Sequence, residues 1–306
     1  MFGIAPDRPQ TESINPYPHA GIPLSFARSS LFSVQEQSTE RLLSHELPVP
    51  RGLKYILTYT GPRLNQQHSL MWQAVVTLLI AEHGADKLVG GQTMTLKTSR
   101  RKLLLAAGKT DTSRVSREWA WETLKELQSG QLELSTPRSG YSNTLLGALV
   151  EDRTGAGKFE IDVDGRMIDL LRDEVATIDL KRKASLGRSQ LALWLHDFIS
   201  TQANHAEGRN RYYPWPVKVL HQLCGSVQGL PQFRIRLADA ADRLKKCENP
   251  LLLEWHINRD KDELVYKKAN TRVILIPEAA QRMQHAVSNH ERGVIEAKQE
   301  RRKTVC

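Results

Sequence analysis

The chain has 306 residues, and its 43 Lys and Arg against 34 Asp and Glu give a formal net charge of +9 and a pI of about 9.5. A hydrophobic fraction of 40% and a charged fraction of 25% are typical of a folded protein and exclude a largely disordered chain. The positive excess favours a polyanionic partner, either nucleic acid or an acidic membrane surface.

No apolar run reaches the roughly 18 to 20 residues that a membrane span requires, because Gln73 and Thr77 interrupt the longest one. The N-terminus has neither a basic start nor an apolar core, so it does not resemble a secretory signal. Three cysteines, odd in number and widely spaced, suit a reducing compartment: Cys224, Cys247 and Cys306. We therefore expect a cytoplasmic protein without membrane contact.

Residues 1–50 are rich in Pro, Ser and other polar residues, which predicts a flexible N-terminal arm. A first domain is expected over 51–165. It opens with a strand in "RGLKYILTYTG", followed by a helix in "LNQQHSLMWQAVVTLLIAEHG" that stops at Gly84. Next come a short helix in "LKTSRRKLLLAAG", capped by Thr98 or Ser99, and a longer helix in "RVSREWAWETLKELQSG", capped by Ser113. "QLELST" and "NTLLGALVED" predict a hairpin wing, and "KFEIDVD" predicts one more strand.

The same order returns in a second domain, expected over 166–277. "GRSQLALWLHDFISTQ", "WPVKVLHQLCG" and "LPQFRIRLADAADRLKK" predict three helices, and "PLLLEWHINRDKDELVYKKA" predicts two strands around a charged turn. Helix, short helix, longer helix and hairpin describe a winged helix-turn-helix. We therefore expect an α+β protein with two tandem winged helix-turn-helix domains, and a C-terminal helix with a basic tail over 278–306.

The helix in "LPQFRIRLADAADRLKK" is the strongest candidate for a DNA-reading element. Five of its residues share an apolar face: Phe233, Leu237, Ala240, Ala241 and Leu244. The opposite face and its flanks carry Gln232, Arg234, Arg236, Asp239, Arg243, Lys245 and Lys246, and the basic wing adds Arg259, Lys261, Lys267 and Lys268. Charge pattern alone favours a solvated surface whose cations pair with Asp239 and Asp242. The repeated topology reverses that preference and predicts a recognition helix.

The corresponding helix of the first domain gives a weaker DNA-binding prediction. Arg114, Arg117 and Lys125 turn outward, but Glu118 and Glu122 dilute their charge. This helix is therefore expected to hold the DNA backbone or another protein. Trp121 also turns outward by helical spacing, and it suits the core or an interface, with the core slightly favoured.

Several stretches in the same order carry a family resemblance: "ARSSLFS", "YTGPRLNQQHSLMWQAVV", "REWAWETLKELQSGQLELS", "QLALWLHDFIST" and "VLHQLCGSVQGLPQFRIRLADAADRLKK". From about Ala27 to Lys268 the chain resembles the TrfA-like plasmid replication initiators. The resemblance implies a bacterial protein that binds direct repeats (iterons) of double-stranded DNA at a plasmid origin and promotes melting of an adjacent segment.

The same resemblance implies a set of partners. These are the host initiator, helicase and polymerase clamp, with single-stranded origin DNA as a further partner and an equilibrium between monomers and dimers. Some such initiators bind the clamp through a peptide ending in Leu-Phe, and "RSSLF" offers Leu31 and Phe32. This peptide lacks the usual leading Gln, so packing against the first domain is favoured.

Catalytic and metal chemistry find little support in the sequence, and we expect neither enzyme activity, nor a metal, nor a cofactor. "RTGAGKFE" (153–160) departs from the phosphate-binding loop pattern. A rolling-circle nicking initiator would use Tyr212 or Tyr213, but no His-x-His pair accompanies them. Four residues could in principle supply zinc ligands, but their irregular spacing argues against a zinc site: His221, Cys224, Cys247 and His256. The main alternative is a winged-helix transcriptional repressor, including one that represses its own gene.

Overall fold

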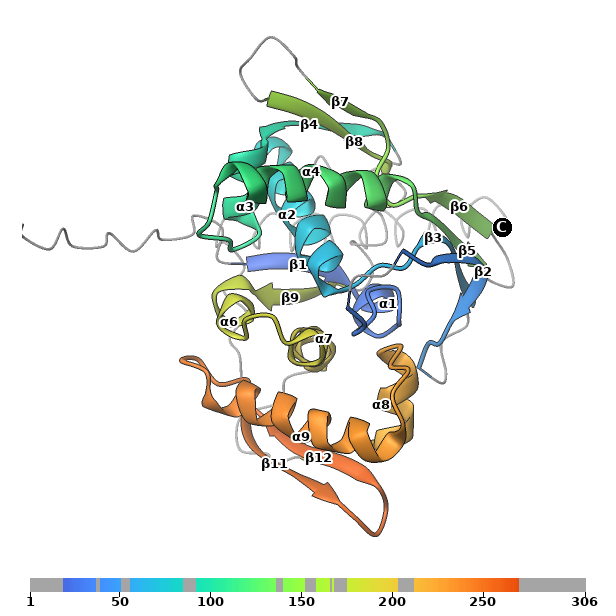
Figure 1. Ribbon diagram of the computed structural model, residues 1–306, viewed down its shortest axis with the longest axis vertical. Coiled ribbons are helices and arrows are strands. Elements are labelled where there is room, and N and C mark those ends of the chain that lie inside the picture. Colours follow the sequence, from blue (N-terminus) through green and yellow to red (C-terminus); the bar gives the residue numbers. More distant parts are fainter. Residues whose placement is uncertain are drawn as a thin grey trace, which may run out of the picture.

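The computed structural model describes residues 19–36, 39–50, 56–84, 92–135, 140–151, 158–165, 167, 175–202 and 212–269, and the structural statements below concern these. The expected C-terminal helix and tail (278–306), Cys306 and the first 18 residues of the expected arm lie outside them. Helices and strands are mixed along the described chain, as expected (Figure 1). None of the described helices combines the length and the apolar character needed to cross a membrane.

One half of the structure is built around α2 (Gln66–His83), a helix buried on nearly all sides. Asn65 caps its start, accepting a hydrogen bond from the Gln67 backbone N–H at 2.9 Å, and the helix stops at Gly84 as predicted. Five further elements complete this unit: β4 (Met94–Ser99), α3 (Arg100–Ala106), α4 (Arg114–Gln128), β7 (Leu149–Glu151) and β8 (Lys158–Val163). The strands form an antiparallel sheet of order β4-β8-β7.

The other half repeats this order of elements. It consists of α7 (Gln190–Ser200), β10 (Tyr213–Pro216), α8 (Val217–Leu223), α9 (Leu230–Lys246), β11 (Leu252–Asn258) and β12 (Glu263–Lys268). Its sheet has the order β10-β12-β11, with the last strand in the middle, as in the first half. In Figure 1, α4 and α9 run across the upper and lower parts of the view, with α2 and α7 between them. The helices predicted in both halves are confirmed.

The expected hairpin wing of the first half is assigned differently in the structure. β5 (Gln131–Ser135) and β6 (Gly140–Thr144) do form a hairpin, but it pairs with β3 (Ile56–Pro62) and β2 (Arg41–Leu47) in the sheet β2-β3-β5-β6. "NTLLGALVED" is not one strand, because Leu145 and Leu146 turn into the core between β6 and β7. The hairpin equivalent to β11–β12 is therefore β7–β8.

The expectation of a flexible arm fails for residues 19–36 and 39–50. β1 (His19–Pro23) pairs with β9 (Val175–Asp179), α1 (Leu24–Ala27) follows, and β2 joins the four-stranded sheet. The Phe26 ring packs edge-on against Trp72, with ring centroids 5.1 Å apart. Apolar side chains in a polar segment thus find a core that composition alone does not reveal.

The apolar side chains form two separate cores. One includes residues from Ala20 to Leu180 and the other includes residues from Leu186 to Tyr266. Met167, Ala176, Ile178 and Leu180 belong to the first core, although they lie beyond the boundary expected at residue 165. A short helix, α6 (Leu180–Ser185), connects the two cores.

Residues 28–36, which we call the strap, join the two halves. Gln66 Nε2 donates to the Phe32 carbonyl at 2.5 Å, and Ser33 Oγ donates to the Leu64 carbonyl at 3.0 Å. On the other side, Trp194 Nε1 donates to the Ser29 carbonyl at 3.3 Å. The strap therefore contacts both the helix α2 and the helix α7.

Candidate nucleic-acid interface

The long helix α9 has the two faces that its sequence predicted. Its five apolar side chains are at most 1% exposed and pack in the second core: Phe233, Leu237, Ala240, Ala241 and Leu244. Five side chains of the opposite face are exposed: Gln232, Arg236, Asp239, Arg243 and Lys246. Pro231 lies in the first turn, where its missing N–H costs no hydrogen bond. Helix α9 thus presents one polar face from a rigid support.

The turn between α8 and α9 is fixed by local contacts. His221 Nε2 lies 2.6 Å from the Gln228 carbonyl oxygen, and its ring stands edge-on to Phe233 with centroids 4.9 Å apart. Gly225 ends α8 with φ of +65°, a left-handed conformation that favours glycine. The angle between α8 and α9 is therefore held by side chains on both helices.

The hairpin β11–β12 is tied to α9 by two carboxylates. Arg234 donates to Asp262 through Nε at 2.7 Å and through Nη2 at 2.9 Å, and these bonds lower the pKa of Asp262 below its ordinary value. Trp255 Nε1 donates to Asp242 Oδ1 at 3.0 Å. In the turn, Asn258 Oδ1 accepts from the backbone N–H groups of Asp260 and Lys261. The cations at the turn are therefore carried on an ordered hairpin.

The cations predicted for this surface fall into two groups. Within the described chain, no carboxylate lies at ion-pair distance from Arg236, Arg243, Arg259 or Lys261, and all four are exposed. The others are occupied: Arg234 binds Asp262, Lys246 Nζ lies 3.0 Å from Asp242, and Lys267 Nζ lies 3.7 Å from Glu254. The first group is available to an external anion.

Lys267 and Lys268 lie at the end of β12 away from the turn, so the structure does not bring them together with Arg259 and Lys261. Lys268 is half-buried and its Nζ donates to the Gln202 carbonyl at 2.7 Å. Burial, followed by the nearby charge of Arg182, lowers the pKa of Lys268 to about 8. Lys268 is therefore engaged inside the fold and contributes little to the exposed basic surface.

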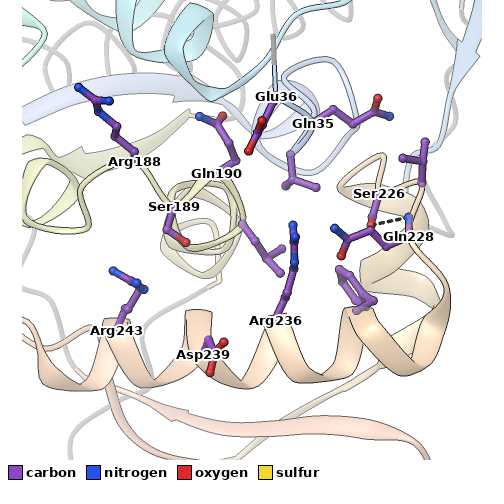
Figure 2. Close-up of a pocket in the computed structure, with 14 residues that line it drawn as sticks. Gln35, Glu36, Arg188, Ser189, Gln190, Ser226, Gln228, Arg236, Asp239 and Arg243 are labelled. Carbon is purple, nitrogen blue, oxygen red and sulfur yellow. Dashed lines mark hydrogen bonds between the residues drawn. The ribbon is translucent and has the colours of Figure 1, made fainter. Parts of the chain in front are cut away.

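A hollow of about 840 Å³ opens along the polar face of α9. Figure 2 shows Arg236 and Arg243 reaching from α9 toward it and Glu36 of the strap facing them from the opposite side. Arg188 and Gln190, at the start of α7, also line it. Sequence reasoning missed Arg188 and Glu36, since nothing in the pattern along the chain places the start of α7 and the strap beside α9.

Helix α4 of the first half carries cations that are mostly paired along the helix. Arg114 Nε lies 2.8 Å from Glu118 Oε1, and Lys125 Nζ lies 2.6 Å from Glu122 Oε1. Arg117 is exposed, and no ion-pair partner lies near it in the described residues. The outward face of α4 is therefore nearly neutral, in contrast to that of α9.

Trp121 packs against the first core, in the position that the sequence favoured. Its ring stands edge-on to Phe159 with centroids 5.5 Å apart, and the Arg100 guanidinium lies 4.9 Å from its centroid. A second hollow, of about 530 Å³, lies nearby on the first half and is lined by Lys97, Lys102, Lys158 and Glu160, with Lys97 Nζ 2.9 Å from Glu160 Oε1. This hollow was also missed from the sequence, because β4 and β8 come together only in the sheet.

Other residues singled out in the sequence have structural roles. Tyr212 donates its hydroxyl to Glu254 Oε2 at 2.5 Å, and Tyr213 stacks on Tyr266. Burial raises the pKa of Cys224 to about 12. No group of three His, Cys, Asp or Glu side chains suited to a metal occurs among the described residues. Leu31 and Phe32 are at most 2% exposed, so the strap as it stands does not offer them to a clamp.

Comparison with known proteins identifies similar folds and no sequence relative. No family model matches the chain, and no curated protein matches it. A selenomethionine structure of domains 2 and 3 of RctB is similar, with a TM-score of 0.51 and 12% identity over 82% of this chain and 99% of that one. A second structure of RctB domains 2–3 has a TM-score of 0.46 and 13% identity over 81% and 97%. The described residues therefore share the mixed α/β fold of RctB domains 2 and 3, while the resemblance to TrfA-like initiators stays a prediction.

Proposed function

We propose that this protein is a sequence-specific double-stranded DNA-binding replication initiator, built from two winged helix-turn-helix units. The repeated order of helix, strand, short helix, long helix and two strands supports this interpretation of each half. In this arrangement α9 is the recognition helix of the second unit and the β11–β12 turn is its wing.

The observation that carries the proposal is the set of unpaired cations on α9. Arg236 and Arg243 are exposed, face a hollow, and have no carboxylate at ion-pair distance in the described chain. Arginine can bind guanine in the major groove through two hydrogen bonds, and both Arg and Lys neutralise phosphates. Arg188 at the start of α7, together with Arg259 and Lys261 at the turn, would bind backbone phosphates on either side.

The first unit would play a supporting part. Its helix α4 presents Arg114 and Lys125 already paired with glutamates, which suits backbone contacts or a protein partner better than base recognition. Arg117, together with Lys102 and Lys158 of the second hollow, would add phosphate contacts. The chain would therefore hold DNA with both units and read its sequence mainly with the second.

The fold shared with RctB domains 2 and 3 supports a role in replication initiation. The resemblance to TrfA-like initiators extends the proposal to direct repeats at a plasmid origin, to melting of that origin, and to the host initiator, helicase and clamp as partners. Because Leu31 and Phe32 are buried, clamp binding would require another segment or release of the strap. The proposal includes no catalytic step.

The test is footprinting on the replicon that carries the gene, followed by affinity measurements with variants of the full chain. Arg236→Ala and Arg243→Ala should weaken binding to the protected site by about 1–3 kcal/mol, with a much smaller loss on random duplex. Lys181→Ala is the control, since Lys181 is an exposed cation of α6 that already pairs with Glu248. Equal losses on both duplexes would reduce an arginine to a phosphate contact. Unchanged binding by both variants would refute α9 as the reading helix.

The footprint also separates the initiator from the alternatives. Several protected direct repeats beside an AT-rich segment support an initiator, whereas a single protected palindrome supports a repressor. A nicking enzyme would instead cut supercoiled origin DNA in a metal-dependent reaction and leave a product joined to Tyr212 or Tyr213.

A further inference from the structure

An apolar side chain occupies the middle of the polar face of α9. Ile235 is 59% exposed, the largest exposed hydrophobic side chain on this helix in the described structure. At about 100° per residue it lies opposite the buried Leu237 and Leu244 side of the helix, with Asp242 and Lys246 on either side of it around the helix. The immediate surroundings are polar or charged, so Ile235 is not the edge of the second core.

A second apolar side chain lies in the turn that leads into α9. Val227 is 77% exposed and lines the same hollow as Arg236 and Arg243. A single exposed apolar side chain on a protein surface needs no explanation. Here Val227 shares a hollow with Arg236 and Arg243, and Ile235 is exposed next to Arg236 in α9; neither arginine has a carboxylate at ion-pair distance among the described residues. This combination calls for a ligand with apolar groups set among anionic and polar ones.

The major groove of DNA has that chemistry. The 5-methyl group of thymine is its apolar feature, next to base-edge hydrogen-bonding groups and flanked by phosphates. An isoleucine placed against a thymine methyl gains from burial, whereas the same side chain against a cytosine edge would bury a polar amino group without a partner. Such a contact distinguishes thymine from cytosine without a hydrogen bond.

We propose that Ile235 is a specificity-determining residue that contacts a thymine 5-methyl group in the major groove, with Val227 contacting a second thymine near the start of α9. This inference rests on the proposed function and names a feature of the DNA that the arginines alone would not select. It predicts a thymine at a defined position of each bound repeat, adjacent to the bases or phosphates that Arg236 and Arg243 contact.

The experiment removes the methyl group and nothing else. Duplexes bound by the full chain are selected from a random-sequence library, and each thymine of the selected duplex is replaced in turn by deoxyuridine. Replacement at each of two positions should weaken binding of the unmodified protein about fourfold, as expected for one buried methyl group. Ile235→Ala should bind thymine and deoxyuridine duplexes equally at one of these positions, and Val227→Ala should lose sensitivity at the other. Leu43→Ala, at an 81% exposed leucine of β2, is the control and should keep the full response.

The outcomes separate this inference from the function on which it rests. If a sequence is selected but no deoxyuridine weakens binding, or if Ile235→Ala keeps the wild-type response at every position, the thymine contact is wrong and the DNA-binding function survives. If Ile235→Ala instead changes only self-association, measured by sedimentation, Ile235 belongs to an interface between copies and the inference is likewise overturned. If no sequence is selected at all, the proposed function itself fails.

Discussion

A buried ion pair between the two cores gives the most informative stability prediction. Lys183 of α6 and Asp197 of α7 are 0% and 2% exposed, and Lys183 Nζ lies 2.5 Å from Asp197 Oδ2. Gln73 of α2 joins the group, since its Oε1 accepts from Lys183 at 3.2 Å and its Nε2 donates to Asp197 at 3.1 Å, and His196 Nδ1 lies 3.2 Å from Asp197 Oδ1. One helix from each half and the connecting helix thus share a single pair of charges.

The distance and burial of the Lys183–Asp197 pair determine how much stability is lost when one partner is replaced. At 2.5 Å and an effective dielectric constant of 20, the attraction is roughly 7 kcal/mol, and it is largely offset by a desolvation cost of several kcal/mol for each ion. The intact pair therefore contributes little net stability. Removing one partner leaves the other charge buried and uncompensated, which costs about 3–5 kcal/mol. Burial lowers the pKa of Lys183, so an unpaired Lys183 partly avoids this cost by losing its proton.

We therefore expect Lys183→Met to destabilise the protein by about 3–5 kcal/mol, and Asp197→Asn by a similar or smaller amount. The double variant, Lys183→Met with Asp197→Asn, leaves neither charge of the pair buried. Its loss of stability should therefore be at least about 2 kcal/mol smaller than the sum of the two single losses. The free energies come from urea unfolding of the full chain, followed by circular dichroism. Additive effects would refute the reasoning.

Two further predictions concern the strap and Lys268. A β-carbon at Gly225 would lie 2.9 Å from Ser30 Cβ, whereas one at Gly187, whose φ of +66° nearly equals the +65° of Gly225, would have nothing within 4 Å. Urea unfolding should therefore show a loss of stability of about 1 kcal/mol for Gly187→Ala and of about 2–4 kcal/mol for Gly225→Ala. Equal losses would show that the strap moves aside to accommodate the methyl group. The pKa of Lys268 falls from 10.5 to about 8 on folding, so the unfolded chain binds more protons between these pH values and stability rises with pH across that window. Relative to Lys268→Met, the unmodified protein should gain about 1–3 kcal/mol between pH 8 and pH 10.5, and an unchanged difference would contradict the burial of its ammonium.

The helices could be predicted because their signals are local. Ser113 accepts a hydrogen bond from the Ser116 backbone N–H at 3.3 Å at the start of α4, and Gly84 ends α2, as their positions in the sequence predicted. Apolar spacing then identified the buried face of α9 residue by residue. Caps and periodicity need no knowledge of distant residues, and this is why they succeed.

The strands that were missed depend on distant partners. β1 pairs with β9, with His19 opposite Asp179, and neither strand alternates strongly enough to be recognised by itself. β10 contains Pro214 and Pro216, which argue against a strand unless it lies at the edge of a sheet, where β10 does lie. The same limit applies to the site: exposure of Arg236 and Arg243 follows from helical spacing, but the pairing of Arg234 with Asp262 requires the hairpin to fold back onto the helix.

The two long helices α4 and α9 differ in how their exposed cations are paired, and this difference bears on which half would recognise DNA sequence. In α4, the exposed Arg114 and Lys125 pair with glutamates within one turn of the same helix. In α9, Arg234 and Lys246 pair with aspartates, but Arg236 and Arg243 have no ion-pair partner among the described residues. A base-reading helix must exchange water for base edges, and a cation already bound to a carboxylate must give up that partner first. The asymmetry therefore favours sequence recognition by α9. The strap and the Lys183–Asp197 pair join the two cores, and through this connection a supporting contact by α4 would help to fix the position of α9 on DNA.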